Sequence, residues 1–255
     1  MNFVFLCEKY PFEVNLIIEQ GNTSTKVAIY ENGVIKASFV YKEFSKESIS
    51  PLLDIYSIDK GIYSTVTDID KELIDYLQRS LPSFLFFDDQ VRLPIVINYK
   101  TPHTLGKDRV AAVVGAQQLE PNKNILIIDA GTCITYEMLE ASGKYVGGNI
   151  SPGMTTRFMA LNHYTRKLPL LEEAEDISEI GMSTEDAIRA GVVNGIVFEM
   201  EGYITRVKEK YTDVLVFLTG GHTFYFESRL KSSIFADINL VLTGLNRILE
   251  YNVEI

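Results

Sequence analysis

The sequence predicts a mixed α/β protein in which one strand–turn–strand pattern occurs twice. Short apolar runs that fit β-strands alternate with longer segments of helical periodicity. The segment LIIEQGNTSTKVAIY at residues 16–30 and the segment NILIIDAGTCITYEML at residues 124–139 share one order of residue types. In each, an apolar run ends in an acid, a glycine follows two residues later, and a polar turn leads into a second strand-like run. We therefore expect two related domains.

The two patterns align residue by residue. Placing Glu19 on Asp129 brings Gly21 onto Gly131, an offset of 110 residues (129 − 19). An acid followed by a glycine turn is common after a strand, so the evidence for duplication is its shared position in two similar units. The polar, proline-containing residues 120–123 (EPNK) are the expected link. We expect domains at residues 1–119 and 120–255.

The elements of the first half follow from periodicity and turn residues. The turn residues Gly21-Asn22 and Asn32-Gly33 separate the first three strands, and Asp108 at the start of a helix suits the helix dipole. Strands are expected at residues 14–20, 25–31, 34–41, 58–66, 84–88 and 93–99, and helices at 71–81 and 108–119.

The second half repeats the order of strands before helices. After the second strand–turn–strand pattern, the sequence predicts a strand at residues 144–151 and a helix after Pro152-Gly153. A long helix is expected at 183–211, because Ser183 and Asp186 have the spacing of a capping box. Residues 214–221 (VLVFLTGG) predict a buried strand, and the tail 238–251 (INLVLTGLNRILEY) predicts a strand, a glycine and a helix.

Composition excludes several classes of protein. With 34 acidic and 24 basic residues the net charge is −10, which argues against nucleic acid as the main partner, although a nucleotide ligand stays possible. The two cysteines, Cys7 and Cys133, indicate a reducing compartment and no disulfide framework. No apolar run reaches the roughly 18–20 residues of a membrane span, and residues 1–10 lack the basic start of a signal peptide. We expect a cytoplasmic protein that binds no membrane.

The two glycine turns have two possible explanations. A hairpin needs only Gly21 and Asn22, which tolerate positive φ. The additional carboxylate, hydroxyls and Lys26 suggest instead that backbone N–H groups and hydroxyls bind a polyphosphate while an acid binds a cation. The occurrence of two such turns favours the phosphate interpretation. No GxxxxGK[ST] sequence is present, so this is not a P-loop.

Other motifs also leave alternatives open. Asp108 and Arg109 fit either a solvated pair at a capped helix start or a general base beside an anion-binding cation. The stripe of Ala187, Gly191 and Gly195 fits internal helix packing or a dimer contact. The Gly-rich runs 147–153 and 219–221 fit tight turns or the close approach of a ligand, and the three histidines show no metal-binding spacing.

Together these motifs resemble the type III pantothenate kinases, members of the acetate and sugar kinase/Hsp70/actin superfamily. The family's acid-x-Gly-Asn-Thr and Asp-x-Gly-Thr phosphate turns are similar to residues 19–23 and 129–132. Its Gly-x-Asp-Arg loop, preceded by a tyrosine, is similar to residues 106–109 with Tyr99. The Gly-Gly-x-Ile-x-Pro-Gly run, the threonine before the long helix and the Thr-Gly-Gly are also present, so the resemblance spans residues 16–221.

The resemblance implies a fold, a reaction and a set of partners. The fold is a pair of duplicated actin-like (ribonuclease H-like) domains, with mixed sheets flanked by helices. The reaction is the ATP-dependent phosphorylation of pantothenate to 4'-phosphopantothenate, the first step of coenzyme A biosynthesis. The family works as a homodimer with Mg²⁺ and a monovalent cation, K⁺ or NH₄⁺.

The resemblance also implies residue roles. Asp108 is the general base, and Asp129 binds the monovalent cation. Glu19 is expected to bind Mg²⁺ as well as ATP. The residues expected to bind pantothenate are Tyr99, Gly106, Lys107, Arg109 and Thr184, and those expected to bind ATP are Glu19, Gln20, Gly21, Asn22, Thr23, Ser24, Thr25, Lys26 and Thr132.

One residue departs from the family pattern. Family members usually carry aspartate where this chain has Glu19, whose extra methylene moves the carboxylate about 1–1.5 Å outward. We expect this to alter the metal geometry before it removes activity. Two alternatives to the kinase are a phosphotransferase of the same superfamily acting on another small hydroxyl substrate, and a non-catalytic, pantothenate-kinase-like regulatory protein.

Overall fold

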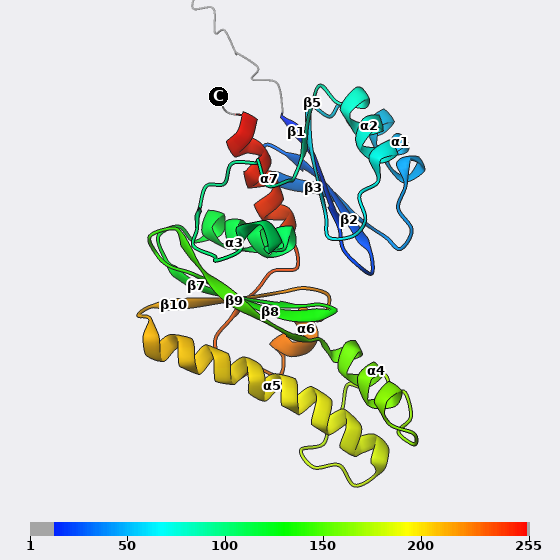
Figure 1. Cartoon of the computed structure of the whole chain (residues 1–255), viewed down its shortest axis with the longest axis vertical. Helices are drawn as coiled ribbons and strands as arrows, with labels where there is room; N and C mark the ends of the chain where they lie inside the picture. Colours follow the sequence, from blue (N-terminus) through cyan, green and yellow to red (C-terminus); the bar gives the residue numbers. More distant parts are fainter. Residues whose placement is uncertain (1–12, 254–255) are drawn as a thin grey trace, which may run out of the picture. The chain divides into compact units, whose positions relative to one another are not determined.

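The computed structural model describes residues 13–253 and divides into two compact units (Figure 1). The N-terminal unit ends at Phe87 and the C-terminal unit begins at Asp88. Residues 1–10, which were examined for a signal peptide, and Cys7 lie outside the described residues. None of the helices within residues 13–253 combines the length and the apolar character that a membrane span requires.

The N-terminal unit is a five-stranded mixed sheet that carries two helices. Its strand order is β3-β2-β1-β4-β5, in which β1, β2 and β3 are antiparallel and β4 and β5 add in parallel. The first three strands have the predicted bounds, because each apolar run ends at a Gly–Asn or Asn–Gly turn. The elements are β1 (Val14–Gln20), β2 (Thr25–Glu31), β3 (Val34–Tyr41), α1 (Lys46–Ile55), β4 (Lys60–Thr65), α2 (Lys71–Ser80) and β5 (Ser83–Phe86).

The helix α1 was not predicted from the sequence. It contains Pro51, which removes a backbone donor from the helix interior and normally argues against a helix. Ser45 compensates at the start, since its side chain and that of Ser48 form a capping box. Ile49 and Leu52 are buried in the core of this unit, so tertiary packing stabilises a helix whose local sequence is unfavourable.

The C-terminal unit contains a six-stranded sheet whose topology repeats that of the first unit. Its order is β11-β10-β7-β8-β9-β6, and β7, β8 and β9 are antiparallel while β10 and β11 add in parallel beside β7. The order β5-β4-β1-β2-β3 therefore has the same directions as β11-β10-β7-β8-β9, which supports the predicted duplication. The strands are β6 (Val96–Ile97), β7 (Asn124–Ala130), β8 (Cys133–Leu139), β9 (Lys144–Pro152), β10 (Val214–Thr219) and β11 (Phe235–Ala236).

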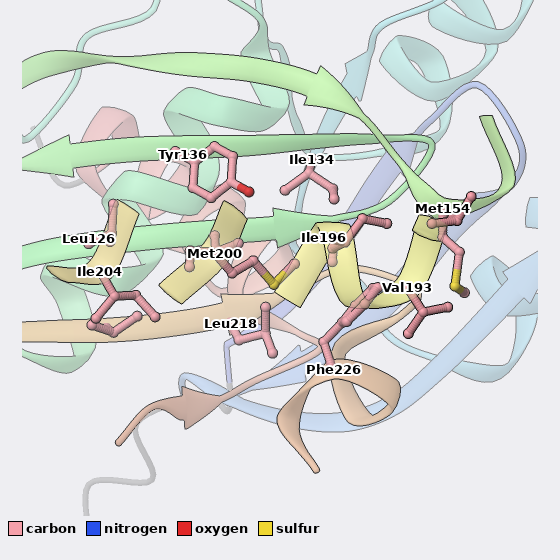
Figure 2. Close-up of a cluster of buried hydrophobic side chains, with 14 of the residues drawn as sticks. Leu126, Ile134, Tyr136, Met154, Val193, Ile196, Met200, Ile204, Leu218 and Phe226 are labelled. Atoms are coloured by element: carbon pink, nitrogen blue, oxygen red, sulfur yellow. The ribbon is translucent and has the colours of Figure 1, made fainter. Parts of the chain in front are cut away.

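Helices cover both faces of the second sheet. α3 and α7 lie on one side of it and α5 on the other (Figure 1). The core on the α5 side is formed by apolar side chains of α5, β7, β8 and β10, including Leu126, Ile196 and Leu218 (Figure 2). The helices are a 3₁₀ turn η1 (Pro102–Thr104), α3 (Lys107–Leu119), α4 (Met154–Tyr164), α5 (Thr184–Lys210), α6 (Thr223–Glu227) and α7 (Leu240–Val253).

Other features also differ from the sequence prediction: the strand expected at residues 93–99 is only the two-residue β6. The division after Phe87 assigns residues 88–119 to the C-terminal unit, whereas the domain boundary was expected at 119/120. The reason is that α3 packs on α7 and β6 pairs with β9. The strand expected at the start of the tail is wrong, because residues 240–253 form one continuous helix. Its Gly244 does not break the helix but lies against Ala111 of α3, where a side chain would overlap backbone atoms.

Candidate functional site

The two acid–glycine turns are closed in a similar way, although the first is one residue longer: Gln20 pairs with Thr25 across it, whereas Ala130 pairs with Ile134 across the second. The N–H of Gly21 donates to the carbonyl of Ser24 at 3.0 Å, and the N–H of Gly131 donates to that of Cys133 at 2.9 Å. A Cβ on Gly21 would lie 3.4 Å from Glu19 Oε1, and a Cβ on Gly131 would lie 3.6 Å from Asp129 Oδ1. Both carboxylates therefore lie over their own turn. The extra methylene of Glu19 does not move its carboxylate away from the glycine.

The predicted ATP-binding residues of the first turn differ in accessibility. Asn22 and Thr23 are exposed at the tip, whereas Thr25 is buried at the start of β2. The amide oxygen of Gln20 accepts a short hydrogen bond from the hydroxyl of Tyr63. Half-buried Lys26 is the cross-strand neighbour of Glu19. The exposed side chains of Asn22 and Thr23 can contact a ligand, whereas Gln20 and Thr25 are placed to stabilise the turn.

The second turn contacts the other glycine-rich motifs of its unit. The carbonyl of Thr132 accepts hydrogen bonds from the N–H of Gly153 at 3.0 Å and from the hydroxyl of Thr156 at 2.7 Å. On its other side, the N–H of His222 donates to the carbonyl of Ala130 at 3.0 Å. A Cβ on Gly220, whose φ is +99°, would overlap the carboxylate of Asp129. The Pro-Gly and Thr-Gly-Gly motifs therefore pack directly on this turn.

Asp108 is positioned at the start of α3. Its Oδ1 accepts a 2.8 Å hydrogen bond from the backbone N–H of Arg109. Burial raises the pKa of the Asp108 carboxyl above its ordinary value of 3.8, although that hydrogen bond and the charge of Arg109 act in the opposite direction. A general base is most effective when its pKa lies near the working pH, which is well above the ordinary value for aspartate. A raised pKa therefore makes Asp108 a better proton acceptor.

Arg109 lies in a buried network on the sheet side of α3. Its Nε and Nη2 donate to the two carboxylate oxygens of Glu137 at 2.6 and 2.9 Å, and Nη2 also donates to the hydroxyl of Tyr145 at 3.1 Å. Burial alone would lower the pKa of Arg109, but the hydrogen bonds and charge of Glu137 raise it, so the guanidinium stays charged. The sequence interpretation missed Glu137. An acid inside the apolar run ITYEML was the available signal, since a buried acid requires a partner.

Of the other residues predicted to bind pantothenate, some lie beside Asp108 and Arg109 and one, Thr184, does not. The ring of Tyr99 lies 5.9 Å from the guanidinium carbon of Arg109 and 6.1 Å from the ring of Tyr145, so it belongs to the Asp108–Arg109 cluster. The amine of Lys107 forms a short ion pair with Asp89.

Thr184 lies apart from that cluster. It is the first residue of α5, after the N-cap Ser183. The Ser183 hydroxyl accepts from the backbone N–H of Asp186 at 3.1 Å and donates to its carboxylate at 2.8 Å. It lines a groove of about 850 Å³ between α4 and α5, together with Arg157 and Tyr164. None of the residues around Asp108 lines this groove.

The carboxylates of Glu19 and Asp129 each suit a cation that takes its other ligands from substrate phosphates, water or backbone carbonyls. Within residues 13–253, no three His, Cys, Asp or Glu side chains are grouped so that they could hold a metal ion alone. A single carboxylate beside a phosphate-binding turn is nevertheless the usual protein contribution to Mg²⁺ bound with substrate phosphates. Glu19 has this placement. Asp129 lies beside the carbonyl of Ala130, which supplies a second oxygen of the kind that a monovalent cation prefers.

Comparison with known proteins decides the family. A family model described as type III pantothenate kinase matches residues 15–206. The chain belongs to the type III pantothenate kinase family. A type III pantothenate kinase of Phocaeicola vulgatus is 46% identical over 239 residues, which cover 94% of this chain and 99% of that protein. A type III pantothenate kinase of Bacteroides fragilis is 47% identical over 239 residues, with 94% and 98% covered.

Solved structures support the fold that this kinase family implies. A candidate Baf family transcriptional activator of Campylobacter jejuni superposes with a TM-score of 0.62 at 20% identity, covering 94% of this chain and 100% of that one. A candidate 2-dehydro-3-deoxygalactonokinase of Sinorhizobium meliloti gives 0.58 at 13% identity, with 94% and 100% covered. The predicted actin-like fold, with two mixed sheets flanked by helices, is confirmed.

Proposed function

We propose that this chain transfers a phosphoryl group from ATP to the primary hydroxyl of pantothenate, the first step of coenzyme A biosynthesis. The observation that carries the proposal is the arrangement at the start of α3. There a largely buried carboxylate, Asp108, is followed by an arginine that a buried acid holds in place. This arrangement occurs in a chain that shares almost half of its residues with relatives named for the reaction.

In the proposed mechanism the chain's own residues position and activate the acceptor hydroxyl. Asp108 accepts the hydroxyl proton as the oxygen attacks the γ-phosphorus, and its raised pKa favours that transfer. Arg109 and Tyr99 bind the acceptor beside it, with Gly106, Lys107 and Thr184 as further predicted contacts. Because Lys107 is paired with Asp89, its contribution requires that pair to rearrange.

The nucleotide is assigned to the two acid–glycine turns. We propose that residues 19–26 and Thr132 bind ATP, with Glu19 toward Mg²⁺ and Asp129 toward K⁺ or NH₄⁺. These assignments are supported by a feature that both turns share: a carboxylate and exposed hydroxyl or amide groups surround a glycine. Mg²⁺ bound with ATP neutralises phosphate charge during transfer. A cytoplasmic location belongs to the same proposal.

The deciding experiment is a coupled assay of the purified protein with ATP, Mg²⁺ and pantothenate, in the presence of K⁺, NH₄⁺ or Na⁺. Turnover that depends on pantothenate and rises with K⁺ or NH₄⁺ is the expected result. Turnover with a panel of other small alcohols, but not with pantothenate, would identify a different phosphotransferase. No turnover under any cation combination contradicts the kinase and leaves the regulatory protein as the explanation.

We also propose that the enzyme is a homodimer that uses residues 184–210 of α5. No described atom lies within 4 Å of a Cβ built on Gly191, and a Cβ on Gly195 would have only Arg157 Nη1 at 4.0 Å. The glycine stripe is therefore not used for close packing among the described residues. Phe198 follows Gly195 on the same helix face and is 70% exposed.

The dimer is tested by light scattering of Phe198→Glu. We expect the wild type to have the mass of two chains and the variant that of one, because a charge in an apolar contact is strongly unfavourable. Phe224→Glu is the matched control, since Phe224 is 62% exposed on α6. A wild-type monomer, or a dimer that persists in Phe198→Glu but is lost in Phe224→Glu, contradicts the assigned surface.

A further inference from the structure

Consecutive residues of β8 serve opposite faces of the second sheet. Tyr136 points toward α5, in the apolar cluster of Figure 2, and its hydroxyl donates to Glu199 at 2.8 Å. Side chains alternate along a strand, so the next residue, Glu137, points to the α3 side. There it is completely buried and meets Arg109, which is 7% exposed. The strand thus places the acid on the face of the sheet where α3 supplies its charged partner.

The surroundings of this pair are closely fitted. The hydroxyl of Tyr145 on β9 donates to Glu137 Oε2 at 2.6 Å and accepts from Arg109 Nη2 at 3.1 Å, which closes a three-membered network. Gly148 lies opposite Glu137 in the β8–β9 pairing. A Cβ on Gly148 would overlap the Glu137 carboxylate and lie 2.8 Å from Arg109 Nη2. The second glycine of the Gly-Gly motif is therefore required by two neighbours, the ion pair and the backbone carbonyl of Tyr136, which a Cβ would also overlap.

Such a pair is a weak source of stability. Desolvation of two buried charges offsets most of their attraction, and apolar residues of similar size often stabilise a fold equally well. What the network does supply is orientation. Its hydrogen bonds use Nε and Nη2 of Arg109, and Tyr99 is a further partner of the guanidinium, so the group is held in one orientation beside the Tyr99 ring. They also fix the first turn of α3, to which the neighbouring Asp108 belongs.

We propose that Glu137 is a positioning residue of the active site: together with Tyr145, in the space left by Gly148, it holds Arg109 in the orientation that binds the acceptor substrate. The inference rests on the proposed function, because it assigns Arg109 to the acceptor. Glu137 is too deeply buried to touch substrate itself, so its effect passes through Arg109. Removing part of the network should therefore weaken binding of the acceptor and leave that of ATP unchanged.

Tyr145→Phe is the mildest test, since it removes the hydroxyl and keeps the ring. We expect the KM for pantothenate to rise about 3–10-fold, as the loss of one ordinary hydrogen bond predicts, with the KM for ATP unchanged. Tyr136→Phe is the matched control, because its hydroxyl also donates to a carboxylate but on the other face of the sheet. The control should change thermal stability without changing the KM for pantothenate.

Glu137→Gln gives the stronger effect, and Tyr136→Phe serves as its control as well. We expect the KM for pantothenate to rise about tenfold or more in Glu137→Gln. A merely structural role is distinguished by combining Tyr145→Phe with Arg109→Ala. If the network acts through Arg109, the double variant loses no more kcat/KM for pantothenate than Arg109→Ala alone, whereas independent effects would multiply.

The outcomes separate this inference from the function on which it rests. Wild-type turnover combined with unchanged KM values for pantothenate in folded Tyr145→Phe overturns the positioning role alone. Multiplicative losses in the double variant overturn it too. A wild-type protein that neither turns over pantothenate nor binds it in a calorimetric titration refutes the proposed function and this inference together. Should Glu137→Gln fail to fold, Tyr145→Phe and the double variant still decide the question.

Discussion

Gly106 leaves the space that the carboxylate of Asp108 occupies. A Cβ on Gly106 would lie 2.5 Å from Asp108 Oδ1 and 3.6 Å from the side-chain carbons of Arg109. The glycine of the Gly-x-Asp-Arg motif was expected to contact pantothenate, and the structure adds a second reason for it. Any larger residue displaces the proposed general base from its position against the backbone N–H of Arg109.

We therefore expect Gly106→Ala to lower kcat. A displacement of about 1 Å at a catalytic group can reduce a rate by about 100-fold, so a loss of that order is predicted while the protein stays folded. Steady-state kinetics and a thermal melt on the same preparation check both parts. Gly202→Ala, whose added Cβ meets nothing among the described residues within 4 Å, is the control. Because Gly202 lies in the α5 surface proposed for the dimer, the mass of this variant is checked by light scattering on the same preparation. A Gly106→Ala enzyme with the wild-type kcat would show that Asp108 needs no such space.

Asp108→Asn separates catalysis from stability. Asparagine keeps an oxygen that accepts the hydrogen bond from Arg109 but cannot accept the substrate proton. We expect kcat to fall by about 10²–10⁴-fold, the usual contribution of a general base, with pantothenate binding largely kept. At neutral pH the variant should be at least as stable as the wild type, since it removes a buried charge. Near-wild-type turnover would place the base elsewhere.

The raised pKa of Asp108 gives a pH dependence of known sign. Burial is its main cause, so the folded protein binds the proton more tightly than the unfolded chain does. Activity should fall as the pH drops through the folded-state value, with a midpoint above 3.8. The stability advantage of Asp108→Asn should be full above the folded-state pKa and shrink as the pH falls toward the unfolded-state value. An advantage that grows on acidification contradicts the raised pKa.

How much the sequence predicts depends on whether the signal is local. The strands around Gly21 and Gly131 were predicted well, because an apolar run and a turn residue are adjacent in the chain. The N-cap role of Ser183 was predicted for the same reason, although Asp186 bonds to its hydroxyl and not, as a capping box requires, to its backbone N–H. The tail was misread because its apolar residues fit a strand, whereas Gly244 serves a contact with Ala111, more than a hundred residues away.

The candidate site shows the same limit. Asp108 and Arg109 were found as neighbours at a helix start, but the acid that holds Arg109 lies 28 residues further on. Only the β8–β9 register and the packing of α3 bring Glu137, Tyr145 and Gly148 around one guanidinium. Sequence spacing carries no information on such a cluster, although a lone acid in an apolar strand marks one of its members.

The different cations proposed for the two turn carboxylates predict separate cation dependences. Glu19 Oε1 and Asp129 Oδ1 lie at similar distances from the Cβ positions of their turn glycines, 3.4 and 3.6 Å. We expect Glu19→Gln to raise the Mg²⁺ concentration for half-maximal rate by about tenfold, within the range seen when a group supporting a metal is removed. Asp129→Asn should instead weaken activation by K⁺ or NH₄⁺. Titration of each cation at saturating levels of the other checks both, and a reversed pattern would exchange the assignments.

The crossing of α3 and α7 predicts a stability effect far from the turns. A Cβ on Gly244 would overlap the carbonyl oxygen of Ala111, and a Cβ on Gly115 would overlap that of Leu240, so each helix requires the other's glycine. The obstructing atoms are backbone, which cannot move aside as a flexible side chain can. We expect Gly244→Ala to lower the free energy of unfolding by about 2–3 kcal/mol, as overpacking of a tight contact does.

Chemical denaturation measures this effect, and Gly202→Ala again supplies the comparison. Gly202 is exposed within the α5 surface proposed for the dimer, so both glycine variants are compared in the monomeric Phe198→Glu background. There alanine at position 202 should be neutral or stabilise by about 0.4–1 kcal/mol through its better helix propensity. Opposite signs for the two glycine-to-alanine changes would establish that Gly244 is required by the helix crossing. Equal stabilisation in both would mean that α7 shifts along α3 to accommodate a side chain.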